Sequence, residues 1–225
     1  MERSQYNLCM AVLKRLHQAG ILEHIVLVGS WCGLFYQTYF GDKSFLPLLK
    51  TRDMDLLIPR PSSITRKVDV AQLLEELGFV VGFTGEQGYI RLEHPALIVE
   101  FLTPERGRSI DKPVNLPQLG LNAQSLRFMD YLADNTITVV VQDIAVTVPH
   151  PANFALHKLI ISDRRTDRDK KDKDIQAAGR VLEALIQAGQ NHSIHRAFDA
   201  MPKRWRQMVD KALQKLEIEG LDLIR

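Results

Sequence analysis

Two aspartates interrupt an apolar segment that is typical of a β-strand. Residues 51–58 read Thr-Arg-Asp-Met-Asp-Leu-Leu-Ile, which places Asp53 and Asp55 two positions apart. Successive side chains of a strand point to opposite faces, so the two carboxylates share one face while Met54 and Leu56 point into a core. Like charges on one face repel, and burying them is costly without a cation. Magnesium prefers such oxygen ligands, so the pair predicts a metal site on a sheet.

A third acid, Glu100, stands in the apolar segment 97–102 and extends this candidate site. Each acid also has a simpler explanation. Asp53 and Asp55 could lie on a solvent-facing edge strand, although aspartate is disfavoured in strands. Glu100 could face solvent or pair with Arg91. The acids alone leave a metal site and an exposed strand open.

Gly29 and Ser30 follow the short apolar strand expected at 25–28 and precede a helix expected at 31–40. A glycine there allows close approach of the backbone to a phosphate, and a helix N-terminus attracts anions. Taken alone, however, these two residues favour an ordinary strand-to-helix turn over a phosphate site.

The order of these motifs resembles the DNA polymerase β-like nucleotidyltransferase superfamily, in particular its bacterial minimal and toxin-related branch. The family pattern is a Gly-Ser turn, an Asp-x-Asp strand and a third carboxylate on a later strand. Gly29-Ser30, Asp53-Met54-Asp55 and Glu100 match it. Two residues depart from the pattern. Arg52 stands before the first aspartate, where an apolar residue or a Ser/Thr-type neighbour is common. The third acid is Glu100, where Asp is more usual.

The resemblance implies a metal-dependent nucleotidyltransferase that moves a nucleoside monophosphate from an NTP to an acceptor hydroxyl. Two magnesium ions would be held by Asp53, Asp55 and Glu100, which are the expected catalytic and metal-binding residues. Gly29 and Ser30 would bind the β- and γ-phosphates, and Arg52 joins them as a nucleotide-binding candidate. The acceptor, whether a tRNA, a protein or a small molecule such as an aminoglycoside, stays open. A toxin-like enzyme would also have an antitoxin partner.

A basic tract at residues 157–174 contains Lys158, Arg164, Arg165, Lys170 and Lys171, and it resembles the C-terminal part of bacterial members of this superfamily. The resemblance implies nucleotide-binding or supporting roles for Lys158, Lys170, Lys171, Asp172 and Asp174. A lysine in this setting acts as a point charge on phosphate. A solvated linker of mixed charge between helices is the alternative reading.

The composition excludes several other classes of protein. The chain has 225 residues, a formal net charge of +2 and two cysteines, Cys9 and Cys32. The charge is too small to predict nucleic-acid binding, and two cysteines make neither a disulfide framework nor a zinc site. No apolar run is long enough for a membrane span, and we expect a cytoplasmic protein. The alternative to an enzyme is a non-catalytic nucleotide-binding or protein-interaction module that keeps the fold.

The order of the expected elements predicts an α+β fold, with a mixed-sheet core at 1–150 and a C-terminal helical bundle at 151–225. Residues 41–50 and 103–122 are expected to be loops, and 125–133 are ambiguous between helix and strand. The expected helices are 4–19, 31–40, 62–77 with a cap at Ser62 or Ser63, 153–162, 172–188, 193–200 and 203–216. The expected strands are 25–28, 53–58, 79–83, 89–92, 97–102, and a hairpin of 136–141 with 144–148.

Overall fold

A computed structural model describes residues 3–41, 51–107, 112–214 and 216. Most of the loop expected at 41–50 lies outside these residues. The chain divides into two compact units, which we describe separately. The first contains residues 3–35 and the described residues from 51 to 148. The second contains residues 36–41 and the described residues from 149 onward.

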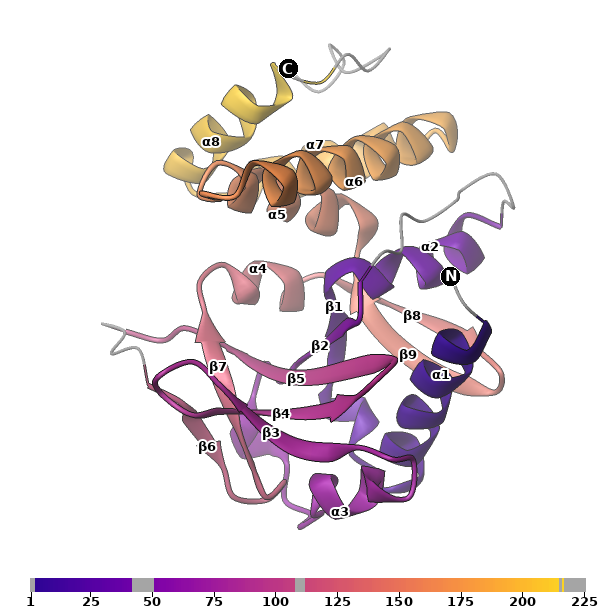
Figure 1. Cartoon of the computed structure of the whole chain (residues 1–225). Coiled ribbons are helices and arrows are strands. Elements are labelled where there is room, and N and C mark those ends of the chain that lie inside the picture. The colour runs from indigo at the N-terminus through magenta and orange to yellow at the C-terminus, as the bar shows by residue number, and fades with distance from the viewer. Residues whose placement is uncertain (1–2, 42–50, 108–111, 215, 217–225) are drawn as a thin grey trace. The chain divides into compact units, whose positions relative to one another are not determined.

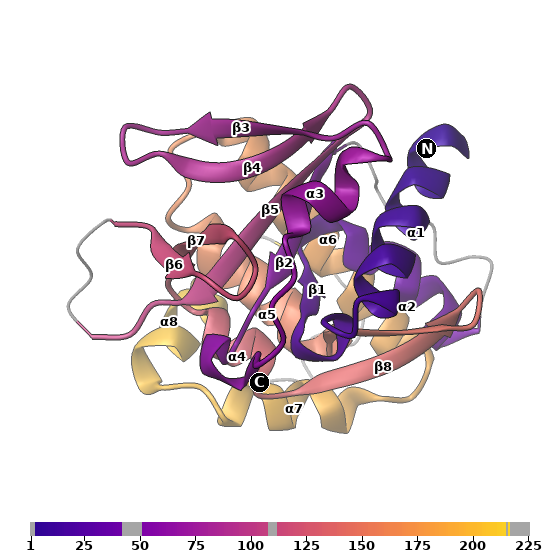
Figure 2. The same ribbon diagram turned by 90° about the horizontal axis from the view of Figure 1, so that it is seen from below.

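In the described part of the first unit, the strands form a seven-stranded mixed sheet with the path β1-β2-β5-β4-β3, and β7 pairs with both β5 and β6. The β2–β5 and β5–β7 pairs are parallel, and the other pairs are antiparallel. Figure 2 shows these strands from below, with the β3–β4 hairpin at one edge of the sheet. The strands are β1 (Val26–Val28), β2 (Asp53–Leu57), β3 (Val80–Thr84), β4 (Tyr89–His94), β5 (Leu97–Pro104), β6 (Val114–Leu116) and β7 (Leu121–Leu126).

Helices lie on both sides of this sheet. Figure 1 shows α3 (Val70–Glu75) and α4 (Met129–Ala133) on opposite sides of it. Helix α1 (Arg3–Gln18) packs against α3 and β5. Three short 3₁₀ turns are η1 (Leu22–His24), η2 (Gly29–Trp31) and η3 (Pro61–Ser63). The expected hairpin is confirmed as β8 (Thr136–Val141) and β9 (Ile144–Pro149).

The predicted start of the helix at 62–77 is wrong. Residues Pro61–Ser63 form η3, and α3 begins only at Val70. The cap of α3 is Asp69, whose side chain accepts a hydrogen bond from the Gln72 N–H at 3.0 Å. The Ser63 hydroxyl instead donates to the carbonyl of Arg60. The Ser63 hydroxyl therefore makes a local hydrogen bond with the Arg60 carbonyl in place of the predicted helix cap.

The long loop expected at 103–122 is also wrong, because it contains β6 and the start of β7. The Asn122 side chain accepts from the Ile90 N–H at 2.8 Å and donates to the Gly88 carbonyl at 3.1 Å. These contacts join segments more than thirty residues apart. The ambiguous segment 125–133 divides into the end of β7 and helix α4.

The second unit is helical. It contains α5 (Pro151–Ser162), α6 (Arg168–Gln187), α7 (Asn191–Asp199), α8 (Lys203–Leu213) and the last residues of α2 (Cys32–Phe40). Helix α5 is almost wholly buried and packs against α6, α7 and α8. The Tyr36 hydroxyl donates to the Pro149 carbonyl at 2.8 Å, which fixes α2 to the start of this unit.

Helix α6 begins four residues before the expected position, since Asp167 caps it by accepting from the Lys170 N–H at 3.1 Å. The mixed sheet and the helical C-terminal part confirm the expected α+β fold class. Within the described residues, no helix has the length and hydropathy that a membrane span needs.

Candidate active site

The register of β2 and β5 places the three predicted carboxylates on one face of the sheet. Asp55 is the parallel partner of Glu100, and Asp53 is the partner of Ile98. Met54 and Leu56 are fully buried on the opposite face, while Asp53 is exposed and Asp55 and Glu100 are half-buried. The alternation read from the sequence is therefore confirmed, and the partner strand of Asp55 is the one that carries Glu100.

The turn at Gly29 adjoins this row. Val28, the last residue of β1, is the antiparallel partner of Asp55. Gly29 has a φ of 73°, in the left-handed region that L side chains rarely adopt. A Cβ at position 29 would collide with Oδ2 of Asp55. Gly29 therefore allows the turn and leaves the space that the Asp55 carboxylate occupies.

An apolar cluster borders the carboxylates on the same face. Leu57 and Leu102 follow Asp55 and Glu100 by two positions each, so they share their face. Both pack with Val28 and with side chains of α4. The cluster consists of Val26, Val28, Leu57, Leu102, Met129 and Leu132. The acids therefore stand where the apolar part of this face ends.

The environment of Glu100 raises the pKa of its carboxyl above the usual range. Burial is the main cause, the negative charge of Asp53 adds to it, and Arg91 opposes it. Arg91 is the antiparallel neighbour of Glu100, but its Nε donates to Glu93 Oε1 at 2.6 Å. Burial and the nearby negative charge of Asp53 therefore both disfavour the ionised form of Glu100 when no cation is bound.

This pKa shift predicts a pH-dependent stability difference between the wild type and Glu100→Gln. A raised folded-state pKa means that ionised Glu100 costs stability as pH rises through that pKa. Glu100→Gln should therefore melt at a higher temperature than the wild type at pH 7 without metal. The difference should vanish below about pH 4, where the wild-type carboxyl is protonated in both states. Melting curves across this range check it, and a lower Tm for the variant at pH 7 would contradict it.

A model of a nucleotidyltransferase family matches residues 7–202. The chain belongs to this family. The chain is thus an enzyme that transfers nucleotidyl groups, and the expected resemblance to the DNA polymerase β-like superfamily is confirmed. No curated protein matches the chain.

Solved structures that are similar to this chain include other nucleotidyltransferases. The solution structure of the antibiotic-resistance factor ANT(2'')-Ia has 13% identity and a TM-score of 0.50, covering 96% of this chain and 94% of that one. A crystal structure of ANT(2")-Ia in complex with adenylyl-2"-tobramycin has 13% identity and a TM-score of 0.49, covering 94% and 98%. An antigenic nucleotidyltransferase-like protein from Paracoccidioides brasiliensis has 14% identity and a TM-score of 0.46, covering 96% and 89%.

The geometry of this nucleotidyltransferase predicts that Gly29→Ala damages activity more than a matched glycine variant. Left-handed backbone costs a non-glycine residue about 1–2 kcal/mol, and the added methyl must also displace Asp55. A misplacement of about 1 Å costs on the order of 100-fold in rate. Gly88→Ala is the control, because Gly88 has a φ of 70° and no atom within 4 Å of the added Cβ. Equal transfer rates for the two variants would contradict the role of Gly29.

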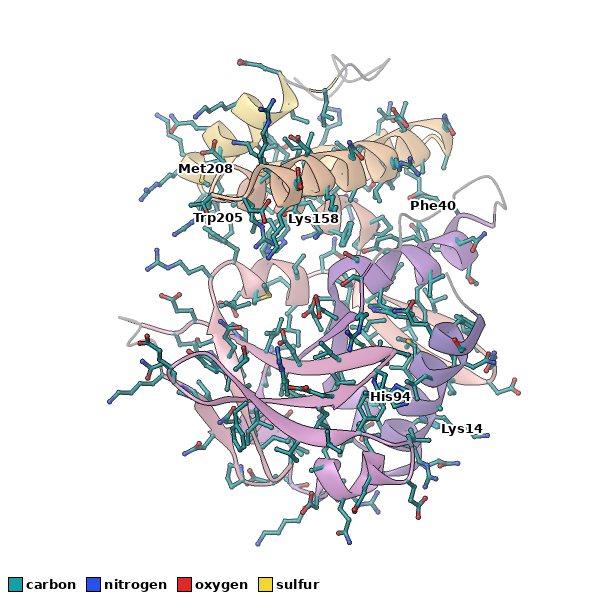
Figure 3. The ribbon with its side chains drawn as sticks, viewed as in Figure 1. Lys14, Phe40, His94, Lys158, Trp205 and Met208 are labelled. Atoms are coloured by element: carbon teal, nitrogen blue, oxygen red, sulfur yellow. The ribbon has the colours of Figure 1, made fainter. Side chains whose placement is uncertain are left out.

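The structure places Arg52 away from the carboxylate row of the nucleotidyltransferase. Its guanidinium donates to the backbone carbonyl of His94 at 3.0 Å, at the end of β4 (Figure 3 labels His94). Ser30 lies beside Gly29 in η2 and is half-buried. The N-cap of η2 is Val28, whose apolar side chain cannot accept a hydrogen bond from the N–H groups of this turn.

In the second unit, the structure joins two of the predicted basic-tract residues in a buried ion pair. Lys158 Nζ donates to Asp174 Oδ1 at 2.7 Å, and Arg165 Nε donates to Oδ2 of the same carboxylate at 3.0 Å. Lys158 lies on α5 (Figure 3) and Asp174 on α6. His157, beside Lys158, is buried, and this burial lowers its pKa to about 3, so its ring is neutral.

The other three residues of the tract lie at the start of α6. Lys170 and Asp172 are exposed, and Lys171 is half-buried. The nucleotide-binding roles of the tract stay predictions. Sequence reasoning named Lys158 and Asp174 but missed that they pair, and it missed Arg165 as the second partner of Asp174.

Sequence reasoning also missed two successive contacts that lead to Asp53. Thr51 contacts the Asp53 carboxylate, and Gln5 on α1 contacts the backbone of Thr51. The one feature of the sequence that could have indicated Thr51 is its place two residues before the first aspartate. Nothing local in the sequence singles out Gln5, because its contacts lie 46 and 91 residues away.

The carboxylates suit magnesium in type and in shared face. Oxygen ligands from Asp and Glu are those that a hard divalent cation takes. Among residues 3–41, 51–107 and 112–214, however, no three acidic, His or Cys side chains are gathered closely enough to hold an ion. The strand register places Asp53, Asp55 and Glu100 on one face, but their described side-chain positions do not form a closed metal site.

Proposed function

We propose that this enzyme transfers a nucleoside monophosphate from an NTP to an acceptor hydroxyl and depends on magnesium. The observation that carries the proposal is the pairing of Asp55 with Glu100 on parallel strands, with Asp53 on the same face and Gly29 against Asp55. Such a cluster of negative charge is unfavourable unless a cation joins it. The substrate polyphosphate would bring the same requirement for divalent cations.

The three acids and the turn at Gly29 would have different roles in the reaction. Asp53 and Asp55 would hold both of two magnesium ions, and Glu100 would hold the one nearest the attacking hydroxyl. Bound magnesium supplies charge neutralisation at the pyrophosphate leaving group and lowers the pKa of the hydroxyl. Glu100 would accept the hydroxyl proton. The backbone N–H groups at Gly29 and Ser30 would orient the β- and γ-phosphates for in-line attack.

The acceptor class is tested most simply with labelled substrates. Each of the four NTPs, labelled at the α- or the γ-phosphate, would be incubated with the enzyme, Mg²⁺ and either total RNA, a protein extract or an aminoglycoside mixture. We expect the α-label to enter one pool and the γ-label to leave as pyrophosphate, with both blocked by EDTA. Transfer of the γ-label to an acceptor would mean phosphoryl transfer and would overturn the proposal.

We also propose an antitoxin partner, because the sequence resembles the toxin-related branch of the superfamily. The growth of cells that express the enzyme alone would test it. Growth arrest by the wild type, and none by Asp55→Asn, would support a toxin, whereas equal growth would place the enzyme outside this class.

A further inference from the structure

The hydroxyl of Thr51 binds Asp53 in two ways. Thr51 Oγ1 donates to Asp53 Oδ2 at 3.3 Å, and it accepts from the Asp53 backbone N–H at 3.0 Å. A threonine hydroxyl has one proton to donate and lone pairs to accept, so both contacts exist together. Asp53 is exposed, while Thr51 is half-buried. The hydroxyl therefore links the carboxylate to the start of β2.

Thr51 is itself held from the other side of the sheet. Gln5 Nε2, on α1, donates to the carbonyl of Thr51 at 2.9 Å and to that of Ala96 at 3.1 Å. The Ile98 N–H also donates to the carbonyl of Arg52 at 2.8 Å. One side chain of α1 thus ties together the starts of β2 and β5, the two strands that carry the acids.

We propose that Thr51 is a positioning residue that orients the Asp53 carboxylate for metal binding, and that Gln5 fixes Thr51. An exposed aspartate that turns freely must lose rotamer freedom when it binds an ion. Residues that hydrogen-bond a ligating carboxylate orient it and tune its affinity. This inference rests on the proposed function.

The test compares Thr51→Val with Thr51→Ser. Valine keeps the branched shape and removes the hydroxyl, whereas serine keeps the hydroxyl. Mn²⁺ binding in the presence of a non-hydrolysable NTP would be measured by electron paramagnetic resonance. The values of kcat and KM for the NTP would be measured from transfer rates with Mg²⁺. We expect Thr51→Val to weaken Mn²⁺ binding and to lower kcat by about tenfold, the size of a hydrogen bond to a charged group. KM should change little, and Thr51→Ser should recover most of the loss.

The outcomes separate this inference from the proposed function. If Asp53→Asn loses Mn²⁺ binding and Thr51→Val binds like the wild type, Thr51 has no positioning role. If Thr51→Val and Thr51→Ser lose binding equally, the hydroxyl is not the cause and the inference also fails. If the wild type and Asp53→Asn bind Mn²⁺ alike, the proposed function itself is wrong.

Gln5 supplies an independent variant. Gln5→Leu removes the donor to Thr51 and should weaken Mn²⁺ binding in the same direction. If Gln5 acts through Thr51, Gln5→Leu should add little in the Thr51→Val background, and the two effects should not sum. Full additivity would overturn the connection between Gln5 and Thr51.

Discussion

Asp55→Asn is expected to lower nucleotidyl transfer by about a thousandfold. Asparagine keeps the size of the side chain that fills the space above Gly29 but lacks its negative charge. Asp55 is central to the carboxylate row, since its strand partners are Val28 on one side and Glu100 on the other. Metal-ion catalysis supplies several kcal/mol, and each 1.36 kcal/mol is tenfold in rate. Initial rates with α-labelled NTP measure the effect.

The matched control is Asp143→Asn, which removes the same charge from an exposed turn. Asp143 lies between β8 and β9 with a φ of 62°, a conformation that asparagine also tolerates. Its transfer rate should equal that of the wild type. Circular dichroism would establish that both variants are folded. An Asp55→Asn rate within tenfold of the wild type would contradict a metal-binding role for Asp55.

The second large effect is on stability, at Asp174. Asp174→Ala is expected to lower the free energy of unfolding by about 3–5 kcal/mol, because removing one partner of a buried pair leaves an uncompensated charge. The exposed fraction of the side chain is 7% for Asp174 and 11% for Lys158. Arg165, with 42% exposed, regains contact with water when Asp174 is lost, so Lys158 accounts for most of the cost. Urea unfolding at pH 7 measures it.

Two further variants isolate the cause of this loss. Asp172→Ala removes an exposed acid from the same helix and should change stability by no more than about 0.5 kcal/mol. Lys158→Met with Asp174→Leu removes both charges and should recover much of the loss, since apolar replacement of a whole buried pair is often neutral. A double variant as unstable as Asp174→Ala would show that packing, and not the unpaired charge, sets the cost.

Local patterns were sufficient to predict the acidic face of the sheet. The alternation of Asp53, Met54 and Asp55 fixes which side chains point together in any strand, whatever its partner. The same alternation holds for Glu100 between Val99 and Phe101, which are both buried. The side-by-side pairing of Asp55 with Glu100 was beyond local reasoning, because it depends on the register of two strands that are distant in the chain.

The incorrect predictions of secondary structure have the same cause, because they also depend on contacts between segments that are distant in the chain. Strands β6 and β7 are held by partners such as β5 and by the Asn122 side chain, none of which a local pattern reveals. The start of α3 was misplaced because Ser63 and Asp69 are both acceptable helix caps by type, and only the fold decides between them. The contact between Thr51 and Asp53 is local, but no residue preference distinguishes it from an ordinary turn.

The most direct test of the three-carboxylate metal site is a crystal structure with Mn²⁺ and a non-hydrolysable NTP, recorded for anomalous scattering. We predict manganese peaks bound by oxygen atoms of Asp53, Asp55 and Glu100, with the triphosphate beside Gly29 and Ser30. A bound triphosphate with no manganese at these carboxylates would contradict the account.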